Sequence, residues 1–172
     1  MDDKDLFIGN RLVDSRVCRL TPGSGVDLDK FSRADLPLNK EMTFILIARI
    51  ICDKWIGEFV EAARNIKSTY PNIRFQLLGP LGVENRTSIS NEQMDEWQKD
   101  GLIEYLGETD NVVNYIESAC CVVLPSYREG TSKVLLEAAA MGRPLIATDV
   151  PGCRAVSYTH LRAHETGRNL VC

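Results

Sequence analysis

Residues 120–141 read CCVVL-PSYREGTS-KVLLEAAAM, and this stretch decides the fold. The apolar run at its start is typical of a buried β-strand, and the run from Lys133 to Met141 is rich in helix-forming residues. A short polar loop separates the two runs. One acid, Glu129, lies in this loop, and a second, Glu137, lies inside the helical run. The stretch therefore predicts a strand, a loop and a helix that together carry two carboxylates.

The predicted loop is suited to a phosphate group. A loop that leads into a helix offers unpaired backbone N–H groups and the positive end of the helix dipole. Gly130 allows the backbone to approach a ligand closely. The carboxylates of Glu129 and Glu137 cannot bind phosphate, but they can accept hydrogen bonds from hydroxyl groups. A ligand that carries both phosphates and hydroxyls is therefore indicated, and a nucleotide sugar is such a ligand.

The chain on either side repeats the strand and helix patterns. Apolar runs predict strands at residues 44–48, 74–78, 103–106 and 145–148, and helical spacing predicts helices at 56–69, 91–99 and 111–118. This alternation favours an α/β fold, a doubly wound parallel sheet with helices on both faces. We expect the Rossmann-like strand order 3-2-1-4-5, with ligands bound beyond the carboxyl ends of the strands.

Two cations, Arg49 and Lys54, follow the first predicted strand. They would lie at the mouth of the ligand crevice, opposite the Glu129 loop, where they could neutralise a diphosphate. Taken alone, these residues are ordinary solvated charges, and Glu137 could simply pair with Lys133 one helical turn away. Their predicted position favours the binding role.

Composition excludes several classes of function. The 172 residues include 20 basic and 24 acidic ones without a basic cluster, which argues against a nucleic-acid partner. No apolar run has the length of a membrane span. The cysteines form no C-x-x-C pair, so a reducing cytoplasm is the simplest setting, without thiol-bound metal.

The two ends of the sequence differ from its middle. Residues 156–172 resemble a translated sequencing adapter, and we expect them to be a non-native tail. The start, at Met1, resembles an internal methionine, so the sequence is expected to be a fragment with one domain at residues 1–155. Both histidines, His160 and His164, lie in the tail. A catalytic triad or a zinc site that needs histidine is therefore not expected in residues 1–155.

Together these segments resemble the C-terminal, nucleotide-sugar-binding domain of family-4 retaining glycosyltransferases with the GT-B fold. The resemblance covers nearly all of residues 1–155 and is strongest to bacterial enzymes that build capsule, O-antigen or other glycans on a polyprenyl-diphosphate carrier. Its marks are, in chain order, Gly23-Ser24-Gly25-Val26-Asp27-Leu28, Ala48-Arg49 with Asp53-Lys54, Leu77-Leu78-Gly79, Tyr105-Leu106-Gly107, Leu124-Pro125-Ser126, the Glu129/Glu137 pair, and Gly142-Arg143-Pro144 to Pro151-Gly152.

The resemblance implies a role for individual residues. Arg49 and Lys54 would hold the donor diphosphate, and Glu129 would face the anomeric carbon of the donor sugar. These three would be the catalytic residues. The other implied donor-binding residues are Glu137 at the ribose, Gly130 and Thr131 at the phosphate, Gly79, Tyr105, Leu106 and Gly107 around the base, and Ser126.

The resemblance also implies an activity. The chain would be the donor half of a hexosyl- or N-acetylhexosaminyltransferase that uses a UDP-sugar and needs no metal or other cofactor. A lipid-linked or glycan acceptor would bind an N-terminal domain that this sequence lacks, so the fragment alone would transfer nothing. The full-length enzyme would be cytoplasmic, or peripheral on the inner face of the plasma membrane.

Two residues depart from the family pattern, and two other functions remain open. Trp55 stands where the family usually has glycine, and Ser132 stands where proline is common, although Ser132 can still cap a helix. The alternatives are a stand-alone nucleotide-sugar-binding module and a UDP-sugar epimerase of the same fold. The spacing of Glu129 and Glu137 argues against the epimerase.

Overall fold

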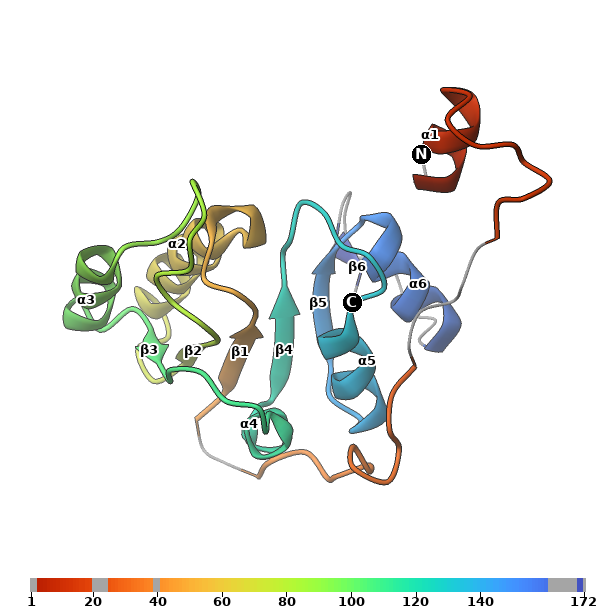
Figure 1. The fold of residues 1–172 in the computed structure, drawn as a ribbon. Coiled ribbons are helices and arrows are strands. Elements are labelled where there is room, and N and C mark those ends of the chain that lie inside the picture. Colours follow the sequence, from red (N-terminus) through yellow and green to blue (C-terminus); the bar gives the residue numbers. More distant parts are fainter. Residues whose placement is uncertain (1–2, 20–24, 39–40, 161–169, 172) are drawn as a thin grey trace.

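The computed structural model describes residues 3–19, 25–38, 41–160 and 170–171, and Figure 1 shows their arrangement. The strands are β1 (Thr43–Ile47), β2 (Arg74–Leu78), β3 (Glu104–Tyr105), β4 (Cys121–Leu124), β5 (Leu145–Thr148) and β6 (Leu170–Val171). The helices are α1 (Asp3–Gly9), the 3-10 turn η1 (Cys52–Lys54), α2 (Ile56–Lys67), α3 (Asn91–Lys99), α4 (Val113–Ser118), α5 (Lys133–Ala140) and α6 (Pro151–His160).

The strands form one sheet in the order β3-β2-β1-β4-β5-β6. The first five are parallel, and β6 adds to β5 in the antiparallel direction. The predicted α/β class and the strand order 3-2-1-4-5 are therefore confirmed. Strand β1 lies between β2 and β4, with Phe44 opposite both Phe75 and Cys121.

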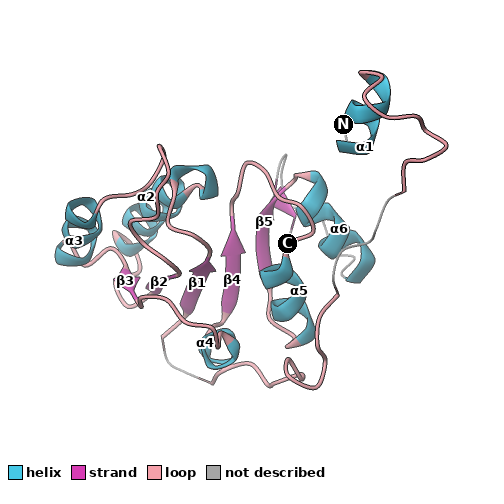
Figure 2. Cartoon of the chain, in the orientation of Figure 1, coloured by secondary structure: helices cyan, strands magenta, loops and turns pink. Residues whose placement is uncertain are grey.

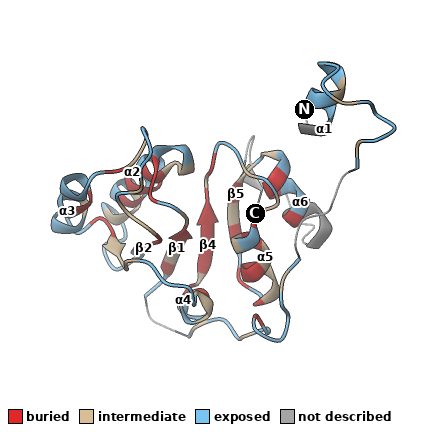
Figure 3. Cartoon of the chain, viewed as in Figure 1, coloured by how far each residue is buried: buried red, intermediate tan, exposed pale blue. Residues whose placement is uncertain are grey.

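Both faces of the sheet are covered, as a doubly wound fold requires (Figure 2). Successive side chains of a strand point to opposite faces. In β1, Ile45 and Ile47 pack in a core with residues of α4, α5 and α6, whereas Leu46 packs in a second core with residues of α2 and α3. Figure 3 shows the buried strands between helices whose outer sides are exposed. The near-continuous apolar runs of the sequence follow from this double burial.

The predicted elements match the observed ones with a few differences. Strand β3 is shorter than predicted, and α4 begins after Val112, which makes no side-chain capping bond. Helix α6 was not predicted. It runs through Val156, which is fully buried in the core, into the segment predicted to be a non-native tail. The non-native origin of residues 156–172 stays a prediction. Gly23, Ser24 and most of the tail lie outside the described residues.

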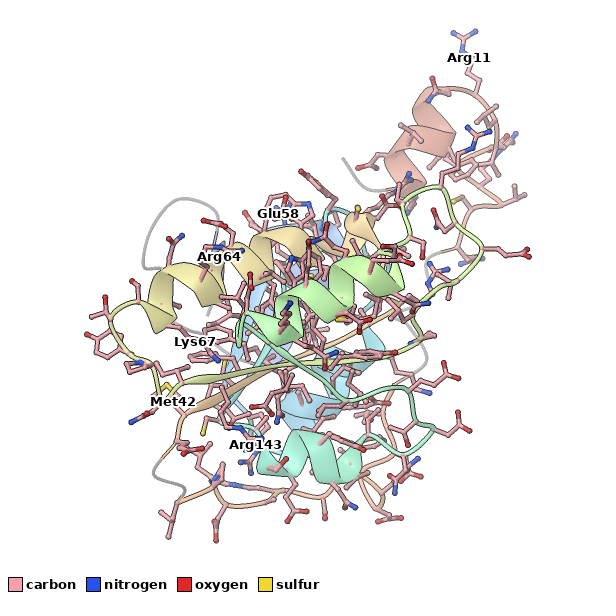
Figure 4. The ribbon with its side chains drawn as sticks, turned by 90° about the vertical axis from the view of Figure 1, so that its left-hand side faces the viewer. Arg11, Met42, Glu58, Arg64, Lys67 and Arg143 are labelled. Carbon is pink, nitrogen blue, oxygen red and sulfur yellow. The ribbon has the colours of Figure 1, made fainter. Side chains whose placement is uncertain are left out.

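A buried arginine holds the segment before β1 against the turn between α5 and β5. Arg143, labelled in Figure 4, lies in the turn between α5 and β5 with 2% of its surface exposed. Its guanidinium donates hydrogen bonds to the backbone oxygens of Ala34 and Asp35, and more weakly to that of Met141. Carbonyl oxygens rather than an acid thus surround this cation within the described part of the chain. The contact ties residues 34–35 against the α5–β5 turn.

Alanine is predicted to destabilise the fold at Gly79, just after β2, and to stabilise it at Gly57. Gly79 has φ +144°, and a Cβ there would overlap the carbonyl group of Ala48. Gly79→Ala is therefore expected to lower the free energy of unfolding by about 1–3 kcal/mol or more. Gly57 lies in α2 with open space around it, so Gly57→Ala should raise stability by about 0.4–1 kcal/mol. Urea denaturation of both variants measures the contrast, and equal effects would contradict it.

Candidate functional site

The loops that follow β1 and β4 lie side by side at the carboxyl edge of the sheet. This follows from the parallel pairing of β1 with β4, which sends both chains out of the sheet at the same edge. The backbone N–H of Tyr127 donates to the carbonyl of Asp53 at 3.3 Å and joins the two loops. The sequence-based expectation that Lys54 faces the Glu129 loop is therefore met.

Lys54 and Glu129 form an ion pair with 2.5 Å between Nζ and Oε1. Only 16% of the lysine side chain and 14% of the glutamate side chain are exposed, so solvent screens their attraction weakly. An ammonium group and a carboxylate at this distance make a charge-assisted hydrogen bond. An anionic ligand at this edge could replace Glu129 as the hydrogen-bond acceptor of the Lys54 ammonium group.

The Glu129 loop leads into α5 through a capped helix start. Ser132 is the N-cap, and its side-chain oxygen accepts a hydrogen bond from the N–H of Leu135 at 3.4 Å. The serine at this position, one of the two departures noted in the sequence, therefore caps the helix as expected. Within the described part of the chain, the N–H groups of Gly130 and Thr131 make no hydrogen bond. These two donors and the helix dipole can therefore receive an anion.

The start of helix α6 packs against the backbone of the Glu129 loop. A Cβ on Gly152 would overlap the carbonyl oxygens of Gly130 and Glu129, so the two backbones pack directly on each other. Next to it, burial and the nearby Glu129 charge raise the pKa of the Cys153 thiol to about 11. Gly152 was singled out only as part of a motif, because its contact depends on how α6 returns to the sheet.

Ser126 belongs to the same loop, two residues after β4, and is fully buried. Its backbone oxygen accepts from the Thr148 hydroxyl at 2.5 Å, and its own hydroxyl has no hydrogen-bond partner among the described residues. The structure therefore places Ser126 at the start of the loop, with its side chain below the protein surface. Its predicted contact with a donor stays a prediction.

The second carboxylate, Glu137, lies on α5 and is 6% exposed. Burial raises the pKa of this carboxyl, while the charges of Lys133 and Lys30 act in the opposite direction. Lys30 is distant in sequence, and sequence reasoning considered only Lys133 as a neighbour. A carboxylate held inside the protein in this way gains from ligand hydroxyl groups that donate to it.

A cavity of about 450 Å³ lies along the same edge of the sheet. Its walls come from the ends of β1 and β2, the loop before α4, and Val134 at the start of α5. The lining residues are Ile47, Ala48, Leu78, Gly79, Pro80, Glu108, Thr109, Asp110, Val112 and Val134. Glu137 lies one helical turn beyond Val134, on the same side of α5. The sequence predicted residues 79–82 and 107–110 at this edge of the sheet, whereas Val112 and Val134 were not predicted to line a site.

The predicted base-binding residues form one hydrogen-bonded unit, of which Gly79 lines this cavity. The Tyr105 hydroxyl donates to the Gly79 carbonyl at 2.9 Å, and the Gly79 N–H donates to the Gly107 carbonyl at 2.8 Å. The N–H of Leu106 donates to Leu77, which continues the pairing of β2 and β3. The structure therefore brings Gly79, Tyr105, Leu106 and Gly107 together.

Arg49 occupies a different environment from Lys54. It follows β1, is exposed, and has no ion-pair partner among the described residues. Its backbone carbonyl accepts from the N–H of Ile51 at 2.9 Å, which turns the chain toward Lys54. The structure places Arg49 at the predicted edge of the sheet but shows no contact that joins its side chain to the ion pair.

The described residues hold neither a metal-binding cluster nor a membrane-spanning helix. Residues 3–19, 25–38, 41–160 and 170–171 contain no group of three or more His, Cys, Asp or Glu side chains placed to hold a metal ion. The predicted absence of a metal requirement stays a prediction. None of the helices in these ranges combines the length and the apolar character that crossing a membrane requires.

Known proteins resemble the chain both in sequence and in structure. A family model described as glycosyl transferases group 1 matches residues 41–170. The N,N'-diacetylbacillosaminyl-diphospho-undecaprenol alpha-1,3-N-acetylgalactosaminyltransferase of Campylobacter jejuni is 31% identical over 83% of this chain and 39% of its own length. The UDP-Gal:alpha-D-GlcNAc-diphosphoundecaprenol alpha-1,3-galactosyltransferase of Escherichia coli is 29% identical over 88% of this chain and 41% of its own length.

A solved structure shows the same fold. The crystal structure of a glycosyltransferase from Rickettsia africae superposes with a TM-score of 0.67 and 17% identity, over 88% of this chain and 43% of that one. At this identity the likeness concerns the fold alone, a Rossmann-like half of a GT-B protein. The chain spans about a quarter to two-fifths of the length of the curated relatives it matches. With the family model matching most of the chain, the protein belongs to the group 1 glycosyl transferases.

Proposed function

We propose that residues 1–155 are the donor-binding half of a retaining glycosyltransferase. The enzyme takes a sugar from a UDP-sugar and transfers it to a glycan or a polyprenyl-diphosphate-linked acceptor. The observation that carries the proposal is the Lys54–Glu129 ion pair, which stands next to the unbonded N–H groups of Gly130 and Thr131. The names of the Campylobacter and Escherichia relatives, which act on diphospho-undecaprenol acceptors, support the acceptor class.

The donor diphosphate is bound by cations and backbone N–H groups. Lys54 exchanges Glu129 for a phosphate oxygen, and the exposed Arg49 adds a second positive charge. Gly130 and Thr131 donate their N–H groups at the start of α5. The leaving diphosphate is thus stabilised by fixed positive charge, and a metal ion has no part in the proposal.

The sugar and the nucleoside lie on either side of the diphosphate. Glu129, released from Lys54, accepts hydrogen bonds from the donor sugar and faces its anomeric carbon. Glu137 accepts from the ribose hydroxyls, and the cavity next to Gly79 and Tyr105 receives the base. In the transfer step the bond from the anomeric carbon to the diphosphate breaks and the acceptor oxygen bonds on the same face. The acceptor hydroxyl proton passes to the leaving diphosphate.

The acceptor requires a second domain. The curated relatives are more than twice as long as the part that this chain matches, and a GT-B enzyme reacts in the cleft between two domains. We place the acceptor site in a domain N-terminal to this one. The complete enzyme works in the cytoplasm or at the inner face of the plasma membrane, where polyprenyl-diphosphate acceptors are accessible.

Removing either cation is predicted to weaken the binding of UDP. Lys54→Ala and Arg49→Ala each remove a charged contact to the diphosphate, and we expect roughly a ten- to hundredfold loss of affinity. Isothermal titration calorimetry with UDP and UDP-sugars measures the loss. The control is Arg64→Ala, since Figure 4 shows Arg64 on α2, where its side chain pairs with Glu61 at the surface. Unchanged UDP affinity in both site variants would show that neither side chain binds the diphosphate.

Glu129→Ala is predicted to abolish transfer without disrupting the fold. In the full-length enzyme we expect turnover to fall at least about a hundredfold, because the donor sugar loses its carboxylate contact. Circular dichroism should still show the parent fold, and the melting temperature should fall because Lys54 loses the partner of its largely buried charge. Glu61→Ala, which removes an exposed acid on α2, serves as the matched control. Near-normal turnover of the Glu129 variant is incompatible with the proposed role.

Glu137→Gln is predicted to raise stability and to lower UDP affinity. Because burial raises the pKa of Glu137, the folded state holds this proton more tightly than the unfolded state. The parent therefore loses stability as pH rises from the ordinary carboxyl pKa through the raised one. The variant lacks this loss, so urea denaturation should favour it at about pH 7 and show a smaller difference at about pH 4. Calorimetry should show weaker UDP binding, whereas a residue that only packs would leave UDP affinity unchanged.

A further inference from the structure

Trp55 has an unusual backbone conformation for its residue type. It has φ 55° and ψ 39°, in the left-handed region, and is the single cap residue between the turn η1 and helix α2. A bulky side chain rarely adopts this conformation, because its Cβ approaches the following carbonyl oxygen. Glycine adopts it without strain. The backbone of Trp55 is therefore held in place by contacts around it.

The indole of Trp55 carries a second unfavourable feature. Its Nε1–H is buried and has no hydrogen-bond partner among the described residues. A buried donor without an acceptor has lost its bond to water and gained none in return. Two uncompensated costs thus coincide on one residue, and that residue directly follows Lys54. Such outliers are characteristic of positions that move or bind.

The contact that holds Trp55 comes from the other loop of the site. Its ring meets that of Tyr127 edge to face, with 4.1 Å between centroids and an angle of 71° between the rings. The Tyr127 N–H also donates to Asp53 at 3.3 Å. Tyr127 is 61% exposed, so the ring lies at the surface. The pair therefore bridges the loop of Lys54 and the loop of Glu129.

We propose that Trp55 and Tyr127 form an aromatic latch that holds the two loops in their unliganded arrangement and opens when a diphosphate binds. The proposal rests on the proposed function. A diphosphate that reaches both Lys54 and Gly130 must separate Lys54 from Glu129. Trp55 is covalently next to Lys54, and Tyr127 precedes Glu129 by two residues, so this separation pulls the rings apart. Opening relaxes the Trp55 backbone and lets its Nε1–H reach water or a phosphate oxygen.

Fluorescence of a single tryptophan tests the opening directly. The chain has two tryptophans, Trp55 and Trp97, and the second lies in α3, away from the site loops. Trp97→Phe therefore leaves Trp55 as the only reporter. Titration with inorganic pyrophosphate, and then with UDP, should shift its emission to longer wavelength as the half-buried indole moves away from Tyr127 into water. In the Trp55→Phe variant, which keeps Trp97, the shift should be absent.

Binding affinity provides an independent readout. Tyr127→Ala removes the latch, so it should bind pyrophosphate about two- to tenfold more tightly than the parent, the range that one aromatic pair converts to. Tyr70→Ala is the matched control, because Tyr70 is also 61% exposed but lies after α2, away from the site. Its affinity for pyrophosphate should equal that of the parent.

The outcomes separate the latch from the proposed function. If calorimetry shows pyrophosphate binding while Trp55 emission stays constant at saturation, the latch is wrong and the donor site stands. The same conclusion follows if Tyr127→Ala binds no more tightly than Tyr70→Ala. If neither pyrophosphate nor UDP binds the folded chain, the donor site and the latch fall together.

Discussion

The pairing of β1 with β4 at the centre of the sheet is the constraint on which the site depends. Residues 44–45 align with residues 121–122, although nearly eighty positions of chain separate them. Because the strands are parallel, the loops that follow them leave the sheet at the same edge, and Lys54 comes within 2.5 Å of Glu129. The apolar side chains on both faces of these two strands hold this register. A one-residue slip would turn each side chain toward the opposite face.

The ion pair itself is poorly explained as a device for stability. Both charges have left most of their water, and this desolvation costs free energy that their mutual attraction must first offset. Two further unfavourable features, the positive φ of Trp55 and the buried hydroxyl of Ser126, lie in the same two loops. A region that concentrates such costs is better understood as prepared for a ligand, which supplies the missing partners.

Much of this arrangement could be predicted from the sequence, because it depends on local patterns. Alternating apolar runs and helical spacing gave the parallel sheet and its order, and the loop before α5 indicated the position of Glu129 relative to Lys54. Other features depend on tertiary contacts that no local pattern encodes. Helix α6 was missed because its residues lie partly in the segment predicted to be a tail. The proximity of Lys30 to Glu137 and the contribution of Val112 and Val134 to the cavity follow only from the folded chain.

The close approach of Gly152 to the Glu129–Gly130 backbone has a consequence for how this sequence can change during evolution. Two backbones in direct contact leave no room for even a methyl group, so substitutions at position 152 and in the loop are coupled rather than independent. A larger residue becomes acceptable there only after the loop has retreated. The order in which mutations accumulate therefore matters at this position. We expect residue 152 and the loop to change together in evolution rather than one at a time.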